Sequence, residues 1–459
     1  MKPKLSCPLS LPLFFLLFLG STGLSAQELV VRDAQTGAPL PRVLLISKEN
    51  RASAVTNARG QASLAGFQGQ ARIAISKLGY RSRSLSYGQL EALDFQLALE
   101  PSLLNLDEVV VSATRWREST REIASQVTAL APREVALQNP QTAADLLGLT
   151  DKVFIQKSQQ GGGSPMIRGF ATNRLLYSVD GVRMNTAIFR GGNLQNVISL
   201  DPFAIERTEV FFGPGSVIYG SDAIGGVMSF QTLQPQLATG EKPFVTGGAT
   251  ARMASANNER TAHADVNVGF QKWALLTSIS ANRFGPLRQG RHGPEDYLKS
   301  YHVQRIDSLD RPVQQDDPLR QIPSGYTQHN LMQKLRYKPT EKLDLTYAFH
   351  LSETSDYGRY DRHNRRRNGR PRYGQWDYGP QQWLMNQLTV NHRQENTFYE
   401  EASLRLAQQR FEESRIDRDF NALLQRNRIE EVLAYSANLD FTKTLGQRLE
   451  LYYGAEAVL

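Results

Sequence analysis

The chain has 459 residues, 40% of them hydrophobic, and a formal net charge of +8 at pH 7. Its one cysteine, Cys7, lies in a segment that we predict to be removed, which excludes disulfides, thiol nucleophiles and cysteine metal sites from the rest. No internal run of about 18 apolar residues occurs, so a transmembrane helix is excluded as well.

Residues 1–26 have the pattern of a secretory signal peptide. Two lysines precede the apolar core LPLFFLLFLG (Leu11–Gly20), and small residues around Ser25 suit a cleavage site. An exported chain rarely meets nucleic acid, so we expect no nucleic-acid partner for its basic residues. The basic cluster RHNRRRNGRPR (362–372) is better suited to anionic lipid headgroups or to an anionic ligand.

Residues 27–100 are predicted to form a β-sandwich, because short strand-like runs alternate with the turn signals DAQTG, TNARG and GFQGQ. Through TGAPLPRV and ISKLGY the segment resembles the carboxypeptidase-regulatory-like domain. The enzyme that gives this domain its name binds zinc through His-x-x-Glu, which HGPE (His292–Glu295) and HRQE (His392–Glu395) both match. Two matches among seven histidines show how unselective the pattern is, so we predict no metal site, no cofactor and no catalytic residue.

Residues 101–120 are predicted to be a linker that contains LDEVVVSATR (Leu106–Arg115). Three consecutive valines favour an extended strand. Two interpretations are open at this point. The segment is either one more strand of the sandwich or a spare strand that pairs with the sheet edge of another protein.

Residues 121–232 are predicted to form a glycine-rich α+β unit. In QTAADLLGLT, Thr142 and Asp145 have the spacing of a capping box, and Gly148 can end the short helix. Strand-like runs such as IERTEVFF alternate with glycine-rich loops. No loop continues into Gly-Lys-Ser/Thr and no Gly-x-Ser-x-Gly occurs, so neither a phosphate-binding loop nor a nucleophile elbow is expected.

From residue 240 to 459, long segments alternate apolar and polar residues. His263 and His350 fall on the polar face of this pattern, which we expect to face a lumen. About nine strands are expected, near 244–255, 260–271, 272–284, 327–338, 342–354, 382–392, 398–410, 431–443 and 448–459. After the first link, short connections alternate with long ones at 285–326, 355–381 and 411–430. A soluble sheet with one wet face is the alternative, but alternating link lengths are typical of an outer-membrane barrel.

Together these motifs resemble the TonB-dependent outer-membrane receptors over nearly the whole chain. LDEVVVSA is similar to their TonB box, and SPMIRGF, VDGVRMN and IERTEVFFGPGSVIYGSDAIGGV are similar to successive plug motifs. The N-terminal sandwich resembles the arrangement common in Bacteroidetes members. The resemblance implies a mainly β fold: an N-terminal β-sandwich, an α+β plug domain, and the first part of a transmembrane antiparallel β-barrel, about nine of about 22 strands.

The resemblance implies active import of a scarce nutrient across the outer membrane. The expected partners are TonB with its ExbB–ExbD complex, outer-membrane lipid, and a small-molecule ligand, an iron chelate such as a ferric siderophore or haem. Cobalamin or another non-iron cargo is an alternative. So are a TonB-linked signalling receptor and a surface adhesion protein.

The resemblance also assigns roles to residues. TonB is expected to pair with Asp107, Glu108, Val109, Val110, Val111, Ser112 and Ala113. The plug structure is expected to depend on Arg168, Gly169, Asp180, Gly181, Gly213, Pro214, Gly220, Gly225 and Gly226. Ligand contacts are expected from Arg190 and Asn193 in the plug apex and from Trp376 and Tyr378 in the 355–381 loop. The alternatives are a solvated turn for the apex and a loop that faces solvent or lipopolysaccharide.

The glycines suit a plug folded inside a barrel, because tight turns and close approach to the barrel wall both favour a residue without a side chain. Arg168 is expected to lock the plug to the barrel. Phe212 stands where many members have arginine, so no such contact is expected there. The sugar-receptor subgroup usually reads DASAAAIYG where this chain reads GPGSVIYG, which disfavours that subgroup.

About nine strands are fewer than a plugged barrel needs, and an open sheet edge is not tolerated in lipid. We therefore expect the sequence to be the N-terminal part of a longer protein.

Overall fold

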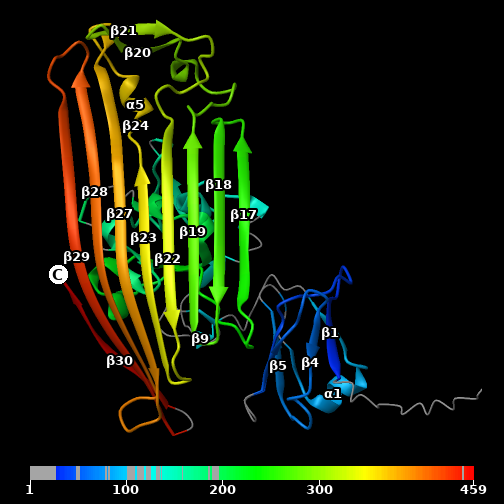
Figure 1. Ribbon diagram of the computed structural model, residues 1–459. Coiled ribbons are helices and arrows are strands. Elements are labelled where there is room, and N and C mark those ends of the chain that lie inside the picture. The colour runs from blue at the N-terminus through cyan, green and yellow to red at the C-terminus, as the bar shows by residue number, and fades with distance from the viewer. Residues whose placement is uncertain are drawn as a thin grey trace, which may run out of the picture. The chain divides into compact units, whose positions relative to one another are not determined.

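In the computed structural model, the description covers residues 27–47, 52–77, 80, 83–100, 109–110, 118–119, 126–130, 135, 137–157, 159–184, 187–188, 196–446 and 449–459. The chain divides into two compact units, Met1–Asn105 and Leu106–Leu459, each described here by itself (Figure 1).

The first unit is a β-sandwich, as expected, with one short helix. Its strands are β1 (Glu28–Asp33), β2 (Leu44–Ile46), β3 (Ser53–Val55), β4 (Gln61–Ser63), β5 (Ile73–Ser76), β6 (Arg83–Leu85) and β7 (Gln96–Leu99). They form the sheets β4-β1-β7 and β3-β2-β5-β6 around a buried apolar core. The helix α1 (Tyr87–Ala92) begins with a capping box in which Ser86 and Gln89 satisfy each other's backbone N–H groups.

The valine-rich segment does not join the described strands of either sandwich sheet. Val109 and Val110 form the strand β8 (Val109–Val110), which pairs with β9 (Glu118–Ser119) in a separate two-stranded sheet. One edge of the predicted TonB-box strand is thus already occupied, by the chain itself. Asp107, Glu108, Val111, Ser112 and Ala113 lie outside the described residues.

The second unit begins with the α+β domain, called the plug below. Its regular elements are β10 (Val127–Leu130), α3 (Ala143–Gly148), β11 (Phe154–Gln156), β12 (Ser164–Met166), β13 (Leu175–Val179), β14 (Val182–Arg183), β15 (Ile205–Phe211), α4 (Ser216–Tyr219) and β16 (Gly226–Thr232). Short 3-10 turns are η1 (Thr172–Arg174), η2 (Asn196–Ser199), η3 (Pro202–Ala204) and η4 (Ser221–Ala223). The central sheet has the order β10-β15-β16-β13-β14. The capping box of Thr142 and Asp145 starts α3, as predicted.

The glycine-rich stretch between β15 and β16 forms α4 and η4 rather than two plain turns. Gly226 opens β16 with φ of 151°, where a Cβ atom would lie 2.7 Å from the carbonyl oxygen of Phe211. Because this neighbour is backbone of the paired strand β15, the sheet cannot move aside for a side chain. Glycine is therefore required here by packing inside the plug, not by the barrel.

The third part is a large antiparallel sheet, called the wall below. Its strands follow one another in chain order: β17 (Phe244–Ala254), β18 (Glu259–Gly269), β19 (Trp273–Phe284), β22 (Tyr326–Tyr337), β23 (Leu343–Thr354), β27 (Tyr373–Arg393), β28 (Glu401–Asp419), β29 (Arg426–Leu445) and β30 (Leu449–Val458). The short strand β24 (Tyr357–Gly358) also pairs with β27. Figure 1 shows the plug against one face of the wall.

Two loops were predicted to be longer than they are. The 355–381 segment is largely structured, because β27 begins at Tyr373, and the 411–430 link shrinks to residues 420–425 between β28 and β29. Polar and charged residues in these strand ends hid the period-two pattern. The end of the wall where the 285–326 and 355–372 connections lie is called the loop end below. It also carries η5 (Glu295–Tyr297), β20 (Tyr301–Ile306), β21 (Leu309–Gln314), α5 (Tyr360–His363), β25 (Arg366–Arg367) and β26 (Arg370–Pro371).

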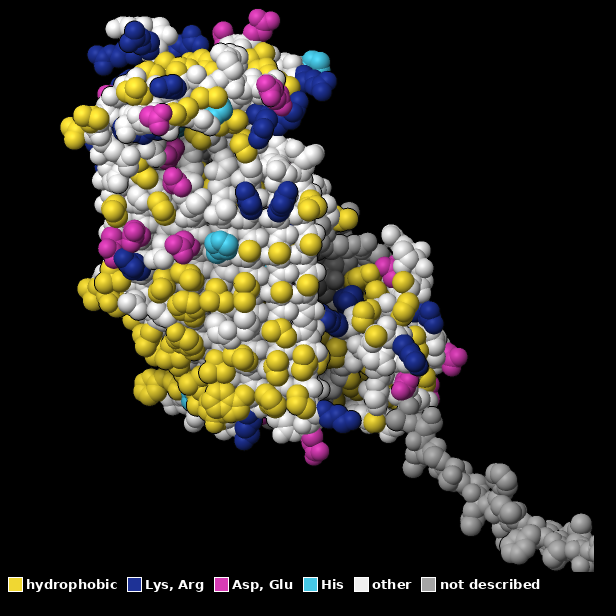
Figure 2. All heavy atoms as spheres, turned by 45° about the horizontal axis from the view of Figure 1, so that its top comes forward, with side chains coloured by type: hydrophobic (Ala, Val, Ile, Leu, Met, Phe, Trp, Pro, Cys, Tyr) yellow, Lys and Arg dark blue, Asp and Glu magenta, His cyan; other side chains and the backbone are white. Residues whose placement is uncertain are grey.

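The two faces of the wall differ as the alternation predicted. In β23, Tyr347 is 42% exposed on the outer face while its neighbour Ala348 is 3% exposed toward the plug. His263 and His350 are both buried on the plug side, as expected. Figure 2 shows a broad apolar band across the outer face, which is the surface that lipid requires. In the described part of the chain, no helix is long and apolar enough to cross a membrane.

We predict that Gly226→Ala destabilises the plug by about 1–3 kcal/mol, the usual cost of overpacking a rigid site. Gly240→Ala is the matched control, because a Cβ there meets open space. Urea unfolding of the two variants measures the difference. Equal midpoints would contradict the packing argument.

In the sandwich, the carboxylate of Asp33 accepts hydrogen bonds from the Tyr80 hydroxyl, at 2.7 Å, and from the backbone N–H groups of Gln35 and Thr36, at 2.8 Å each. These bonds, the Tyr80 bond foremost, lower the pKa of Asp33 from 3.8 to about 2. Because the folded-state pKa is depressed, the stabilisation is complete above the ordinary pKa and disappears as pH falls toward 2.

We therefore predict that residues 27–100 lose stability between about pH 4 and pH 2, and that Tyr80→Phe weakens this dependence. Tyr87→Phe is the control, since the Tyr87 hydroxyl binds Gln27 and not Asp33. Urea unfolding at a series of pH values tests this, and an unchanged pH slope in Tyr80→Phe would refute it.

Candidate functional site

The contacts between plug and wall form the first part of the candidate site. Asp180 lies in the turn between β13 and β14, with φ of 49°. Its carboxylate accepts hydrogen bonds from the ammonium of Lys334 on β22, at 2.8 Å, and from the hydroxyl of Thr232 on β16, at 2.6 Å. Lys334 is only 1% exposed, so this ion pair is removed from water. It is called the central latch below.

A second contact joins the η2–η3 turn of the plug to β18 and β19. The Ser280 hydroxyl donates to the Asp201 carboxylate at 2.6 Å and lies 2.8 Å from the Nδ1 atom of His263. Phe203 stacks on the His263 ring with centroids 4.9 Å apart. His263, one of the two lumen-facing histidines of the prediction, is therefore engaged in holding the plug.

A third contact lies near the loop end. The Arg252 guanidinium donates to the Glu259 carboxylate at 2.6 Å and to plug oxygens at Asn139 Oδ1, 2.9 Å, and the Pro140 carbonyl, 3.0 Å. Gln141 of the plug donates to the same Glu259 at 2.6 Å. The buried Arg252–Glu259 pair of the wall is thus hydrogen-bonded to plug residues 139–141, just before α3.

Wall glutamines also hydrogen-bond plug backbone. Gln387 donates to the carbonyl of Asp180 at 3.1 Å, Gln409 to that of Arg183 at 2.7 Å, and Gln328 to that of Ile198 at 2.8 Å. Asp180 lies in a turn, Ile198 in the 3-10 turn η2, and Arg183 in β14 at the edge of the plug sheet. The wall thus supplies hydrogen bonds to carbonyls at points where the plug sheet ends.

The plug contacts an aromatic cluster at the loop end. Phe284, Tyr326, Tyr357 and Tyr378 pack together, and the Tyr357 ring lies 3.1 Å from where a Cβ of Gly161 would be. Gln160 beside it donates to the carbonyls of Gly285 and Ser324, at 3.1 and 3.3 Å. Gly161 is therefore a glycine position set by close approach to the wall, whereas a Cβ on Gly163 would lie 2.5 Å from that of Ala144 inside the plug.

Trp376 and Tyr378 are not loop residues, contrary to the prediction: both lie in β27. The guanidinium carbon of Arg359 lies 5.3 Å from the Trp376 ring centre and 5.7 Å from that of Tyr378, and Arg362 lies 5.3 Å from Trp376. Chain arginines thus already cover these aromatic faces. The ligand role of Trp376 and Tyr378 stays a prediction.

The other predicted site residues are placed as follows. Arg190 and Asn193 lie outside the described residues. Arg168 has φ of 49°, and its guanidinium lies 3.5 Å from the Phe212 carbonyl oxygen inside the plug, so the expected bond to the wall is not the one observed.

The predicted structural glycines of the plug have these conformations and neighbours. Gly169, Gly181 and Gly220 have φ of 84°, 82° and 83°. Gly213 is half-buried and Pro214 exposed, and a Cβ on Gly225 would lie 2.4 Å from that of Phe170.

Sequence reasoning missed Lys334, Gln387 and the Arg252–Glu259 pair. Lys334 is in phase with Met332 on the plug-facing side of β22, so a charge at an inward position was the available signal. Its partner Asp180 is 154 residues away along the chain, and no local pattern connects the two.

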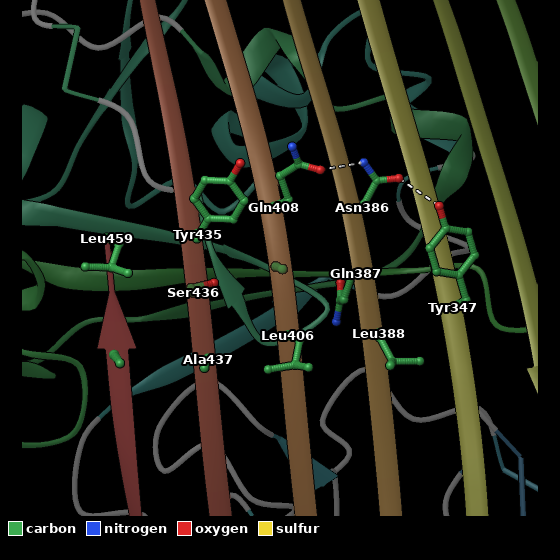
Figure 3. Close-up of a pocket in the computed structure, with 12 residues that line it drawn as sticks. Tyr347, Asn386, Gln387, Leu388, Leu406, Gln408, Tyr435, Ser436, Ala437 and Leu459 are labelled. Carbon is green, nitrogen blue, oxygen red and sulfur yellow. Dashed lines mark hydrogen bonds between the residues drawn. The ribbon is translucent and has the colours of Figure 1, made fainter.

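A shallow cavity of about 420 Å³ lies on the opposite, outer face of the wall (Figure 3). Tyr347 donates to Asn386 at 2.7 Å and Asn386 to Gln408 at 3.3 Å, which forms a polar row above Leu388 and Leu406. This cavity opens on the outer face, although one of its lining residues, Gln387, also donates to the Asp180 carbonyl of the plug. Among the described residues, no group of three or more His, Cys, Asp or Glu side chains is placed to hold a metal ion.

Two family profiles match the chain. The profile described as "TonB-dependent Receptor Plug Domain" matches residues 119–227, and "CarboxypepD_reg-like domain" matches residues 30–111. These ranges correspond to the plug and to the sandwich with its linker.

Known relatives agree with the profiles. A vitamin B12 transporter of Vibrio vulnificus is 36% identical over 172 residues, 37% of this chain and 27% of the transporter. A hemin receptor of Yersinia pestis is 34% identical over 128 residues, 28% of this chain and 18% of the receptor. The solved ferripyoverdine receptor of the outer membrane of Pseudomonas aeruginosa has the same fold, with a TM-score of 0.52 at 11% identity, over 89% of this chain and 51% of that one. This chain thus spans about half the length of the solved receptor, and its match covers about a quarter or less of the curated relatives.

We predict that Lys334→Met destabilises the plug–wall assembly by about 3–5 kcal/mol, because it leaves Asp180 as a buried, unpaired charge. The double variant Asp180→Asn/Lys334→Met should recover much of this loss. Lys338→Met is the control and should cost at most about 1 kcal/mol, because its partner Glu341 is 93% exposed. Thermal unfolding in detergent and limited proteolysis of the plug are the measurements. A Lys334→Met variant as stable as the control would show that the latch is not a significant contact.

Proposed function

Because this chain is a TonB-dependent outer-membrane receptor with an N-terminal carboxypeptidase-regulatory-like domain, we propose that it imports an iron chelate, a ferric siderophore or haem, by rearrangement of the plug inside a β-barrel. The family and the outer-membrane location rest on the matched profiles and relatives. The transport activity, the cargo and the TonB partner are the proposal.

The observation that carries the proposal is the polar character of the plug–wall contacts. The central latch, the Asp201–Ser280 bond and the glutamine bonds to plug carbonyls are interactions that water can replace one by one. A purely apolar interface would resist movement in proportion to its whole area. A hydrogen-bonded interface instead lets the plug shift as water enters, which a passage for solute requires.

The predicted TonB box is the segment on which TonB would pull. Val109 and Val110 adopt extended backbone, and β9 pairs with one edge of their strand. Strand addition by TonB needs a free edge, so TonB either occupies the other edge or displaces β9. In both cases TonB would bind this strand through hydrogen bonds to its backbone N–H groups.

The cargo is argued from charge and from the relatives. Two of the three relatives named above are named for iron-containing ligands, hemin and ferripyoverdine, and the third for vitamin B12. The loop end, where a ligand arrives from outside, carries exposed arginines outside residues 365–372 as well, among them Arg291, Arg311 and Arg320, which suit an anionic chelate. For haem, an axial ligand such as histidine is needed. His363 is engaged with the Trp376 backbone, which leaves His292 and His302 as the loop-end candidates.

The test is growth on limiting iron, with hemin or one of several ferric siderophores as sole source, in cells that express the gene with or without Val110→Pro. We expect growth on one source and its loss in the proline variant, because proline removes the backbone N–H of a pairing residue. Val110→Ala keeps that N–H and should grow as the wild type does.

Each other outcome has a distinct meaning. Growth on hemin that is lost in a His292→Ala/His302→Ala variant would identify haem as the cargo, while unaffected growth on a siderophore would exclude a histidine-ligated cargo. Growth that Val110→Pro leaves unchanged on every source would reject the box assignment and favour adhesion or a non-iron cargo.

A further inference from the structure

The loop end carries a short hairpin rich in arginine. Strands β25 and β26 pair through Arg366 with Pro371 and Arg367 with Arg370, and Asn368 and Gly369 form the turn with φ of 52° and 74°. Two consecutive positive φ values in an Asn-Gly pair are typical of a tight hairpin turn. Five exposed arginines, called the arginine hairpin below, surround this turn: Arg365, Arg366, Arg367, Arg370 and Arg372.

The backbone of the arginine hairpin is fixed to the loop end. Arg372 N–H donates to the Arg365 carbonyl at 2.9 Å, and Phe420 N–H donates to the Arg372 carbonyl at 3.0 Å. The Arg366 guanidinium carbon lies 5.5 Å from the Tyr301 ring centre and that of Arg372 lies 4.9 Å from Tyr373. These contacts hold the hairpin in one place and leave guanidinium N–H groups available to a ligand.

These arginines differ from two firmly paired arginines at the loop end, Arg359 and Arg418. Arg359 pairs with Asp361 at 2.7 Å, and Arg418 pairs with Asp310 through its second guanidinium nitrogen, also at 2.7 Å. Around the five residues of the arginine hairpin, by contrast, the described part of the chain places no carboxylate within the 4 Å of an ion pair. Figure 2, in which the loop end is turned forward, shows lysine and arginine side chains gathered there.

A buried lysine, Lys299, lies near the hairpin. Lys299 is 7% exposed, and its ammonium donates to the His363 carbonyl at 3.0 Å between the rings of Tyr301 and Tyr360. Burial, and after it the charge of Arg366, lowers the pKa of Lys299 to about 8.

We propose that the arginine hairpin is a docking surface for the phosphate groups of lipopolysaccharide in the outer leaflet. Long loops of outer-membrane barrels lie on the external side, where lipopolysaccharide is the surrounding polyanion. Guanidinium groups bind phosphate oxygens in pairs, and a fixed array binds several phosphates at little cost in conformational entropy. The surface lies outside the plug contacts, so its role is to anchor and orient the loop end, not to carry cargo.

The test is binding of purified lipopolysaccharide to the protein in detergent, measured with phosphorylated material, with the same material after dephosphorylation, and with sodium pyrophosphate as a small anion. The variant is Arg365→Gln/Arg366→Gln/Arg367→Gln/Arg370→Gln. Arg32→Gln/Arg59→Gln/Arg72→Gln/Arg83→Gln removes the same charge from exposed arginines of the sandwich and is the matched control. Replacing the same four hairpin arginines by lysine keeps the charge but loses the paired geometry.

We expect the hairpin variant to bind phosphorylated lipopolysaccharide at least about tenfold more weakly, with the sandwich control unchanged and the lysine variant in between. Circular dichroism and unfolding temperature must match the wild type in every variant. An equal loss in the sandwich control, or equal binding of dephosphorylated material, would overturn the proposal. Competition by pyrophosphate at stoichiometric concentration would overturn it in favour of a small-anion site.

Discussion

Each strand of the wall has to satisfy two environments at once. Its backbone must be fully hydrogen-bonded, because lipid offers no partner, and its side chains must be apolar on one face and polar on the other. Pairing with neighbouring strands meets the first demand, and the side-chain period of two in a β-strand meets the second. The outer apolar band and the plug-facing row of His263, Lys334, His350 and Gln387 are consequences of this one constraint.

The polar inner face then determines how the plug is held. The Asp180–Gly181 turn and the edge strand β14 present backbone carbonyls to the wall, and wall glutamines donate hydrogen bonds to them. The charges are treated in the same way, since Asp180, Asp201 and Glu259 each meet a donor from the opposing part. Apolar packing is present as well, where Trp383, Met385 and Phe411 join the plug core. The plug is thus held through contacts that solvent is able to replace, which suits the plug movement that we propose.

The loop end is organised by charge rather than by apolar burial. Several of its arginines pair with carboxylates or lie over aromatic rings, as do Arg359 and Arg362, whose guanidinium carbons each lie 5.3 Å from the centre of the Trp376 ring. The arginine hairpin combines a fixed backbone with guanidinium groups that no described carboxylate pairs with. Unmatched fixed charge is costly to maintain unless a partner of opposite sign is at hand, and the external leaflet supplies one.

Local patterns in the sequence were sufficient for much of the architecture. Alternation predicted the faces of the wall, the capping box of Thr142 and Asp145 predicted α3, and turn signals predicted the sandwich, because each depends on residues close together in the chain. The ordered plug motifs identified the family for the same reason. Sequence patterns failed where polar residues continue a strand beyond its apolar part. The predicted loops at 355–381 and 411–430 were therefore longer than the observed ones, and Trp376 and Tyr378 were assigned to a loop instead of to β27.

What only the tertiary structure decided was which distant residues meet. Asp180 and Lys334, Asp201 and Ser280, and Gly161 and Tyr357 are each brought together by the seating of the plug against the wall. The pairing of Val109–Val110 with β9 and the orientation of Arg168 toward Phe212 likewise depend on backbone paths that composition does not specify. The sequence by itself determined the elements and their faces, since these follow from spacing along one strand or helix. The plug–wall contacts, and the absence of a described carboxylate beside the arginine hairpin, depend on which residues lie close together in space. That proximity exists only after the chain has folded.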